Sequence, residues 1–306
     1  MAESIAARRA VSAPARRRHF ERTLTAYLFV GPALLVLCAF IVYPAIYSFL
    51  LSFHEWNGFT PVWGDFVGVE NYTTLLKDQI FWKAAINSIL FVAVRTPLEV
   101  GIAFGLALLL NQNIPGRSFL RTMFFVPVVM SLIVVTILFQ RILEGNVGFL
   151  NTFLRSAGLD MLARNWLGDP ATALPTVIFV SIWKNVGFSL VILLAGLQGL
   201  PSEVLEAARC DGANRRQLTF RVIVPLMKPI IAIATVLSII GGLKVFDLIY
   251  IMTRGGPTYA TEVFATMLYR HAFDLNEMGV ASALAVVMVL VIMGTSRIQT
   301  LLLRES

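Results

Sequence analysis

Six long apolar stretches constrain this chain more than any other feature of its sequence. A helix needs about 20 mostly apolar residues to cross the hydrocarbon core of a bilayer. The stretches that meet this requirement are residues 26–51, 84–110, 123–142, 173–197, 226–252 and 278–303. The sequence therefore predicts an all-α polytopic membrane protein with about six transmembrane helices.

The composition agrees with lipid as the solvent. Hydrophobic residues make up 57% of the chain and charged residues 14%, whereas a soluble domain is about one quarter charged. The net charge is +7, but the basic residues cluster at the ends of the apolar stretches. They do not form a stripe with interleaved aromatic residues, so we expect anionic lipid headgroups and no nucleic acid as their partners.

The distribution of lysine and arginine predicts the orientation. If the N-terminus is cytoplasmic, the inner segments carry about twice as many of these residues as the outer ones, as the positive-inside rule requires. Both termini are then cytoplasmic. Residues 1–23 form a basic cytoplasmic tail, residues 24–306 form the membrane domain, and the loop 199–225 faces the cytoplasm. The first apolar stretch is too long for a cleaved signal peptide.

Several chemistries are disfavoured by what the sequence lacks. Cys38 lies in the first apolar stretch and Cys210 in a basic loop, so we expect no disulfide. The chain contains no CxxC motif or His/Cys cluster that would indicate a metal site. It also contains no GxxxxGK[ST] motif, so any ATP that drives this protein must be bound, with its magnesium, by a partner.

The loop 199–225 is polar and helical in pattern. Ser202 is a good N-cap, acidic residues occupy the first turns, and Asp211 and Gly212 end the first helix. A second helical stretch covers residues 214–222, and Pro225 begins the next span. Helices this short need a surface to pack on. The residues alone leave two possibilities open: a docking element for a soluble partner, or an interfacial loop paired with anionic lipid.

The same loop carries a specific motif. Glu206-Ala207-Ala208, three residues, Gly212, nine residues and then Val222-Ile223-Val224-Pro225 resembles the EAA motif of binding-protein-dependent ABC importer permeases. Valines replace the isoleucine and leucine of that motif. The resemblance implies that the loop is the coupling helix that fits a groove of the ATPase subunit. The residues that this role would involve are Glu206, Ala207, Ala208, Asp211, Gly212 and Pro225.

Further segments are similar to the carbohydrate-uptake branch of these permeases, the maltose and glycerol-phosphate type. They are Tyr43-Pro44, Gly68 to Tyr72, Phe125-Val126-Pro127, Leu194 to Pro201 and Phe246 to Pro257. The resemblance implies a bacterial or archaeal plasma-membrane permease that imports a sugar or a sugar-like solute. It also implies a complex with a second permease, an ATPase dimer and an extracytoplasmic solute-binding protein. The sequence does not name the sugar.

Polar residues inside the apolar stretches are candidates for a translocation path, because charges at membrane depth are costly and usually face inward. Sugars suit amides, carboxylates and ammonium groups beside aromatic rings. The candidate path residues are Trp183, Lys184, Asn185, Phe246, Asp247 and Tyr250. The alternative is structural, with polar pairs that fix helix contacts. We favour that alternative for Arg95 and Glu99, four residues apart on the second stretch.

The triplet Gly255-Gly256-Pro257 predicts a tight turn after the fifth stretch. The family resemblance implies that this outer loop meets the solute-binding protein or gates the cavity.

Two other functions are considered. A secondary carrier or channel would work without ATP, but the inverted repeats typical of many carriers are not evident. A membrane phosphotransferase is suggested faintly by Asp211-Gly212. Residues 213–246 contain no acid, so the oxygen ligands that a metal would need are missing.

Overall fold

The computed structural model describes residues 27–60 and 64–304, and in this part of the chain the regular elements are all helices. The predicted basic tail, residues 1–23, lies outside the described residues. The chain divides into two units, residues 1–51 and 52–306. The described part of the first unit is one apolar helix, Tyr27–Leu51, whose side chains are almost all exposed.

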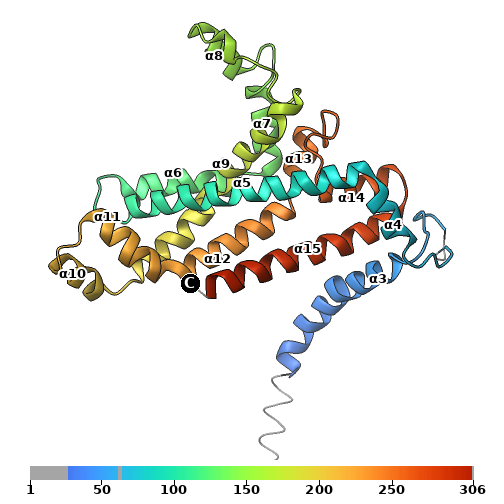
Figure 1. Ribbon diagram of the computed structural model, residues 1–306, viewed down its shortest axis with the longest axis horizontal. Coiled ribbons are helices and arrows are strands. Elements are labelled where there is room, and N and C mark those ends of the chain that lie inside the picture. The colour runs from blue at the N-terminus through green and yellow to red at the C-terminus, as the bar shows by residue number, and fades with distance from the viewer. Residues whose placement is uncertain (1–26, 61–63, 305–306) are drawn as a thin grey trace, which may run out of the picture. The chain divides into compact units, whose positions relative to one another are not determined.

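The second unit is a bundle of long helices with shorter ones at their ends (Figure 1). The long helices are α5 (Gln79–Leu110), α9 (Pro170–Gln198), α12 (Val224–Leu243) and α15 (Met278–Arg304). The shorter α-helices are α4 (Glu70–Lys77), α6 (Arg117–Val129), α7 (Leu132–Ile142), α8 (Phe149–Ser156), α10 (Ser202–Cys210), α11 (Arg215–Gln217), α13 (Asp247–Met252) and α14 (Phe264–Tyr269). Over the described residues, five helices are long and apolar enough to cross a membrane, or six if α6 and α7 count as one bent span.

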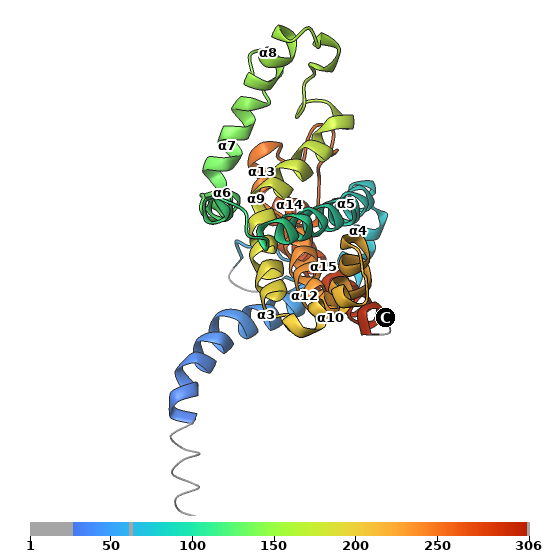
Figure 2. The same ribbon diagram turned by 90° about the vertical axis from the view of Figure 1, so that its left-hand side faces the viewer.

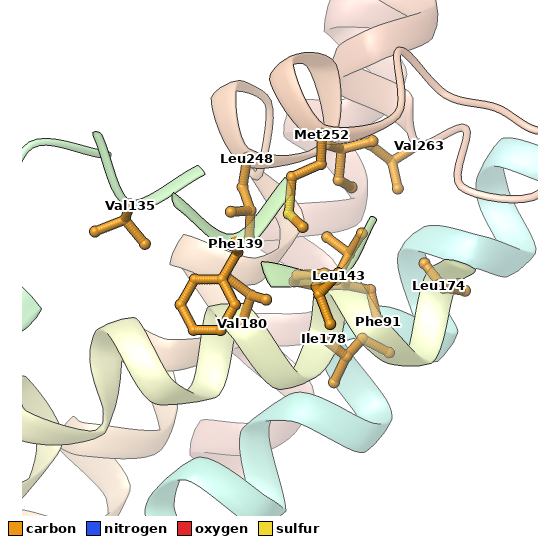
Figure 3. Packing of buried hydrophobic residues seen from close by; sticks show 12 residues of the cluster. Phe91, Val135, Phe139, Leu143, Leu174, Ile178, Val180, Leu248, Met252 and Val263 are labelled. Atoms are coloured by element: carbon orange, nitrogen blue, oxygen red, sulfur yellow. The ribbon is translucent and has the colours of Figure 1, made fainter. Parts of the chain in front are cut away.

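Helix α5 packs along both α9 and α12, and α9 also packs on α6. Buried apolar side chains of α5, α9 and α12 form one core cluster. A second cluster joins Phe91 of α5 and Phe139 of α7 to side chains of α9 and α13, as Figure 3 shows. Both views of the ribbon show α7 and α8 extending away from the long helices (Figures 1 and 2).

Close approach of α6 and α9 depends on a glycine. A Cβ at Gly187 of α9 would clash with the backbone carbonyl of Phe124 on α6. Small residues at helix contacts let backbones approach closely, which is how helices associate where lipid removes the usual hydrophobic driving force. Gly187 therefore fixes where α6 can lie against α9.

The long helices begin earlier than the apolar pattern indicates. The Asp78 side chain accepts from the Ile80 N–H, and the Asp169 side chain accepts from the Ala171 N–H. These caps start α5 at Gln79 and α9 at Pro170, several residues before the predicted starts at 84 and 173. The apolar stretch covers the interior of each helix and omits its capped first turn.

Two predicted spans are broken. The third, residues 123–142, consists of α6 and α7, which bend by 96° at a break around Met130 and Ser131. The fifth, residues 226–252, ends as a helix at Leu243, and α13 begins anew at Asp247. The prediction of continuous helices was wrong at both places. Hydropathy reports how apolar the side chains are, and it does not report where the hydrogen bonds of the backbone are broken.

The predicted N-cap of the loop helix was also wrong. Pro201 occupies the cap position of α10, Ser202 lies inside the helix, and the cap residue makes no side-chain bond. The cap that does form belongs to the next helix. Asn214 accepts from the N–H of Gln217 at 2.9 Å, and the Gln217 side chain accepts from the N–H of Asn214 at 2.9 Å, which is a capping box. Pro225 does not begin a separate span, since one helix runs through it from Arg215 to Leu243.

Candidate functional site

The two helix breaks meet at one cavity. It has a volume of about 230 Å³ and lies between α5, α7, α9 and the α12–α13 break. Its lining residues are Arg95, Leu132, Ser181, Lys184, Asn185, Gly241, Lys244, Val245, Phe246, Asp247 and Leu248. Broken helices near the middle of the membrane are where transporters commonly place their binding sites, because the free backbone groups there line a polar cavity.

Four of the six predicted path residues line this cavity: Lys184, Asn185, Phe246 and Asp247. The Asn185 amide donates to the carbonyl of Ser181 at 2.8 Å, one turn earlier on α9. Asp247 is exposed at the start of α13, and Lys244, which caps the end of α12, is exposed beside it. The cavity thus combines an amide, a carboxylate, an ammonium group and an aromatic ring.

Lys184 is buried, and its ammonium group contacts backbone carbonyls. Its Nζ donates to the carbonyl oxygens of Pro127, Val128 and Met130 at 2.8, 3.0 and 3.1 Å. These carbonyls lie at the end of α6, at the break before α7. The side chain therefore bridges α9 to that break.

Trp183 is not among the residues that line the cavity. Its ring meets the Phe139 ring edge-on, with 5.1 Å between the centroids, and it packs against the apolar cluster of α7, α9 and α13. Consecutive residues of a helix point about 100° apart. Trp183 and Asn185 are two residues apart, so their side chains point about 200° apart and face different surroundings.

Tyr250 lies in an aromatic group next to the cavity. The rings of Phe246 and Tyr250 stack with their centroids 5.1 Å apart, and Tyr269 lies 5.3 Å from Phe246 and 4.8 Å from Tyr250. Phe273 continues the group at 4.9 Å from Tyr269. Sequence reasoning did not include Tyr269 and Phe273 in the path. Their spacing of four residues, which places side chains on one helix face, was the available signal.

Arg95 and Glu99 form the predicted intrahelical pair. Their nearest atoms, Nη2 and Oε2, are 2.7 Å apart, and both side chains are buried. The carboxylate also accepts from Ser189 of α9 at 2.7 Å and from Ser238 of α12 at 3.2 Å, while Arg95 donates to the Ser238 carbonyl at 2.8 Å. The pair thus connects α5 with both neighbouring long helices, as the structural interpretation expects.

The triplet Gly255-Gly256-Pro257 forms the predicted turn, with φ of +79° at Gly255 and a cis bond before Pro257. Thr261 closes the turn by donating to the Gly256 carbonyl at 2.7 Å. The start of α5 holds the loop that follows, since Lys83 donates to the Thr258 carbonyl at 2.6 Å and Asn87 to the Glu262 carbonyl at 2.9 Å.

A buried carboxylate lies against this turn. Burial of Glu262 raises the pKa of its carboxyl above the ordinary value, and Arg270, 3.9 Å away, together with a hydrogen bond from Thr266 opposes that shift. A Cβ at Gly255 would clash with the Glu262 carboxylate. The turn therefore requires glycine for its positive φ, and a side chain there would also displace the Glu262 carboxylate.

Helix α10 in the loop 199–225 is largely exposed. Helix α10 has no fully buried residue; Glu206 and Ala207 are exposed, and Ala208 is half-buried. Gly212 adopts a φ of +80° and turns the chain toward Asn214. Asp211 and Pro225 are also exposed. Glu206, Ala207, Asp211 and Gly212 are thus accessible just before the Arg215–Leu243 helix, whereas Pro225 is exposed inside that helix.

A family model described as "Binding-protein-dependent transport system inner membrane component" matches residues 99–305. The "Probable ABC transporter permease protein YurN" of Bacillus subtilis is 38% identical over 281 residues, 91% of this chain and 96% of that protein. The "Trehalose/maltose transport system permease protein MalF" of Thermococcus litoralis is 32% identical over 260 residues, 85% of this chain and 87% of that protein.

The fold is also that of a solved transporter. A chain from the crystal structure of a bacterial alginate ABC transporter, in complex with a periplasmic protein that holds an alginate pentasaccharide, superposes with a TM-score of 0.80. The alignment covers 92% of this chain and 94% of that chain at 23% identity, and it shows the shared fold. These comparisons do not support the alternative of a secondary carrier or channel. The chain therefore belongs to the family of inner-membrane components of binding-protein-dependent transport systems, as a permease subunit of an ABC importer.

Proposed function

We propose that the cavity at the two helix breaks is the path by which this permease carries a sugar or a sugar-like solute across the membrane. The observation that carries the proposal is the convergence of Asn185, Asp247 and Phe246 on one cavity beside the aromatic group of Tyr250 and Tyr269. Amide and carboxylate groups bind hydroxyls, and aromatic rings cover the apolar face of a sugar. The names of relatives that transport trehalose, maltose or multiple sugars point to the same class of substrate.

The proposal assigns ATP hydrolysis to partner subunits. Helix α10 offers the exposed residues Glu206 and Ala207, and the turn at Gly212 leads directly into the helix Arg215–Leu243, which ends at the cavity. A partner ATPase dimer that moves α10 would therefore move one wall of the path. ATP and magnesium belong to that partner, and no cofactor is assigned to this chain.

The remaining partners follow from the same assignment. A second permease would complete the path, and an extracytoplasmic solute-binding protein would deliver the solute at the outer turn of Gly255, Gly256 and Pro257. The chain would lie in the plasma (inner) membrane of a bacterium or archaeon with both termini in the cytoplasm. The bias of lysine and arginine supports this orientation.

The path is tested by uptake into proteoliposomes that contain the complete transporter. Two single variants are made. Asp247→Asn removes the charge from the cavity, and Asn185→Ala removes the amide. We expect sugar uptake to fall in each variant while the complex still assembles. Ser156→Ala, an exposed position on α8 away from the cavity, is the control. Wild-type uptake in both cavity variants would refute the assignment of the path.

The proposed contact of α10 and the turn at Gly212 with the ATPase needs a separate experiment. A double variant, Glu206→Arg with Gly212→Trp, places a reversed charge and a bulky side chain on the exposed face of the loop. Wild type is expected to copurify with a tagged ATPase subunit, and the variant is expected to enter the membrane without it. Equal copurification of the two proteins would show that the ATPase binds elsewhere.

A further inference from the structure

The end of α6, inside the predicted third span, leaves backbone carbonyls without helical donors. Met130 has ψ of 144° and Ser131 has ψ of 131°, so both residues are extended and the helix stops before them. The last carbonyls of a helix have no intrahelical partner. In a bilayer no water replaces the missing donors, and each unsatisfied group is costly. The break can persist only where another group satisfies these carbonyls.

Lys184 provides that group. An ammonium has three N–H donors, and those of Lys184 meet three carbonyls, at Pro127, Val128 and Met130, over 2.8 to 3.1 Å. A positive charge is also favoured at the negative C-terminal end of a helix. With its three donors used, the ammonium has none left for the hydroxyls of a transported molecule.

The helix contact next to Lys184 supports the same assignment. Gly187, three residues further along α9, is the point where the backbone of α6 comes too close for any side chain. Residues three apart lie on one helix face. Gly187 therefore sets the approach of α6, and Lys184 meets the carbonyls that follow on the same side.

We infer that Lys184 is a positioning residue that holds the break between α6 and α7 open, and that it does not bind the solute. The inference rests on the proposed function, because the wall that it positions belongs to the proposed path. Leu132, the first residue of α7, lines the cavity together with Lys184. Moving the break would move this wall.

The test measures the geometry of the break directly. Cys38 and Cys210 are replaced by Ser, and spin labels are attached at Met123 on α6 and Leu138 on α7, both exposed. Distances between the labels are then measured in the complete transporter in lipid nanodiscs. We expect a single narrow distribution in the parent protein and a broad or shifted one in Lys184→Met, which keeps the length of the side chain and removes its donors. Lys184→Arg retains donors and should restore most of the narrow distribution.

Lys244→Met is the matched control, because it removes a second ammonium from the same cavity without touching α6. It should leave the distance distribution unchanged. If Lys184→Met is too unstable to purify, Lys184→Leu, which also has no donors, is measured instead. An unchanged distribution in the variant without donors overturns the inference.

Uptake measurements on the same proteins separate this inference from the proposed function. If Lys184→Met abolishes uptake with an unchanged label distance, Lys184 acts on the solute and the inference fails while the path stands. If the distance changes but Asp247→Asn and Asn185→Ala transport normally, the positioning role stands and the path fails.

Discussion

The Arg95 guanidinium and the Glu99 carboxylate lie 2.7 Å apart on α5, with both side chains almost completely buried. Ser189 and Ser238 bond the same carboxylate from the two neighbouring helices. A buried charge that loses its partner is strongly destabilising. The stability of the bundle should therefore depend on this pair more than on any ion pair at its surface.

Glu99→Gln is predicted to destabilise the protein by about 3–5 kcal/mol, because it leaves the Arg95 charge buried without a counter-ion. Thermal unfolding in detergent, followed by light scattering, measures the effect. Glu144→Gln is the matched control. It breaks the pair of Arg141 and Glu144, which is 3.6 Å long with both side chains exposed, and should change stability by less than about 1 kcal/mol. Equal effects of the two substitutions would contradict the prediction.

Gly255→Ala is predicted to disrupt the outer turn, because alanine there combines a φ of +79° with a clash against the Glu262 carboxylate. Gly116→Ala separates the two causes. Gly116 has a φ of +75° and nothing within 4 Å of an added Cβ, so only the cost of the left-handed backbone, about 1–2 kcal/mol, applies. The free energy of unfolding should therefore fall further in Gly255→Ala than in Gly116→Ala, which thermal unfolding in detergent measures. Equal losses of stability would show that the Glu262 contact does not constrain the turn.

Stability of this outer loop should fall as pH rises. Burial raises the pKa of Glu262 in the folded protein above its ordinary value of 4.5. The folded state therefore binds the proton more tightly than the unfolded state. The stabilisation is complete below the ordinary pKa and is lost as pH rises through the raised one. Glu262→Gln cannot ionise, so its thermal stability should lose this part of the pH dependence, whereas Glu144→Gln should retain it. Parallel profiles of wild type and Glu262→Gln between pH 4 and 8 would refute the prediction.

The span positions were predictable from hydropathy, but the breaks that shape the cavity were not. The break before α7 depends on Lys184, more than fifty residues later in the chain, and a window of neighbouring residues holds no sign of that contact. Helical geometry explains the error at Trp183. Because residues two apart on a helix point about 200° apart, Trp183 packs in the apolar cluster while Asn185 lines the cavity, although the run of polar and aromatic residues suggested one site.

The helix caps of the loop 199–225 were also only partly predictable from the sequence. Ser202 has the right residue type for a cap, but the chain enters α10 through Pro201 and the cap position makes no side-chain bond. Asn214 and Gln217 carry the pattern of an N-cap and its N3 partner. That signal was present in the sequence, and it marks the start of the helix that runs to the cavity.

Asn214→Ala is predicted to destabilise the start of the Arg215–Leu243 helix by about 1 kcal/mol, the usual cost of a lost N-cap. Because α10 leads through Gly212 into this cap, the loop should lose its fixed geometry while the membrane bundle remains folded. Hydrogen exchange of the Gln217 amide, which donates to the Asn214 side chain, should therefore accelerate about fivefold, which corresponds to that free energy. Ser202→Ala, which removes a hydroxyl from inside α10, should leave the exchange at this amide unchanged. If the two variants exchange alike, the capping box does not hold the loop.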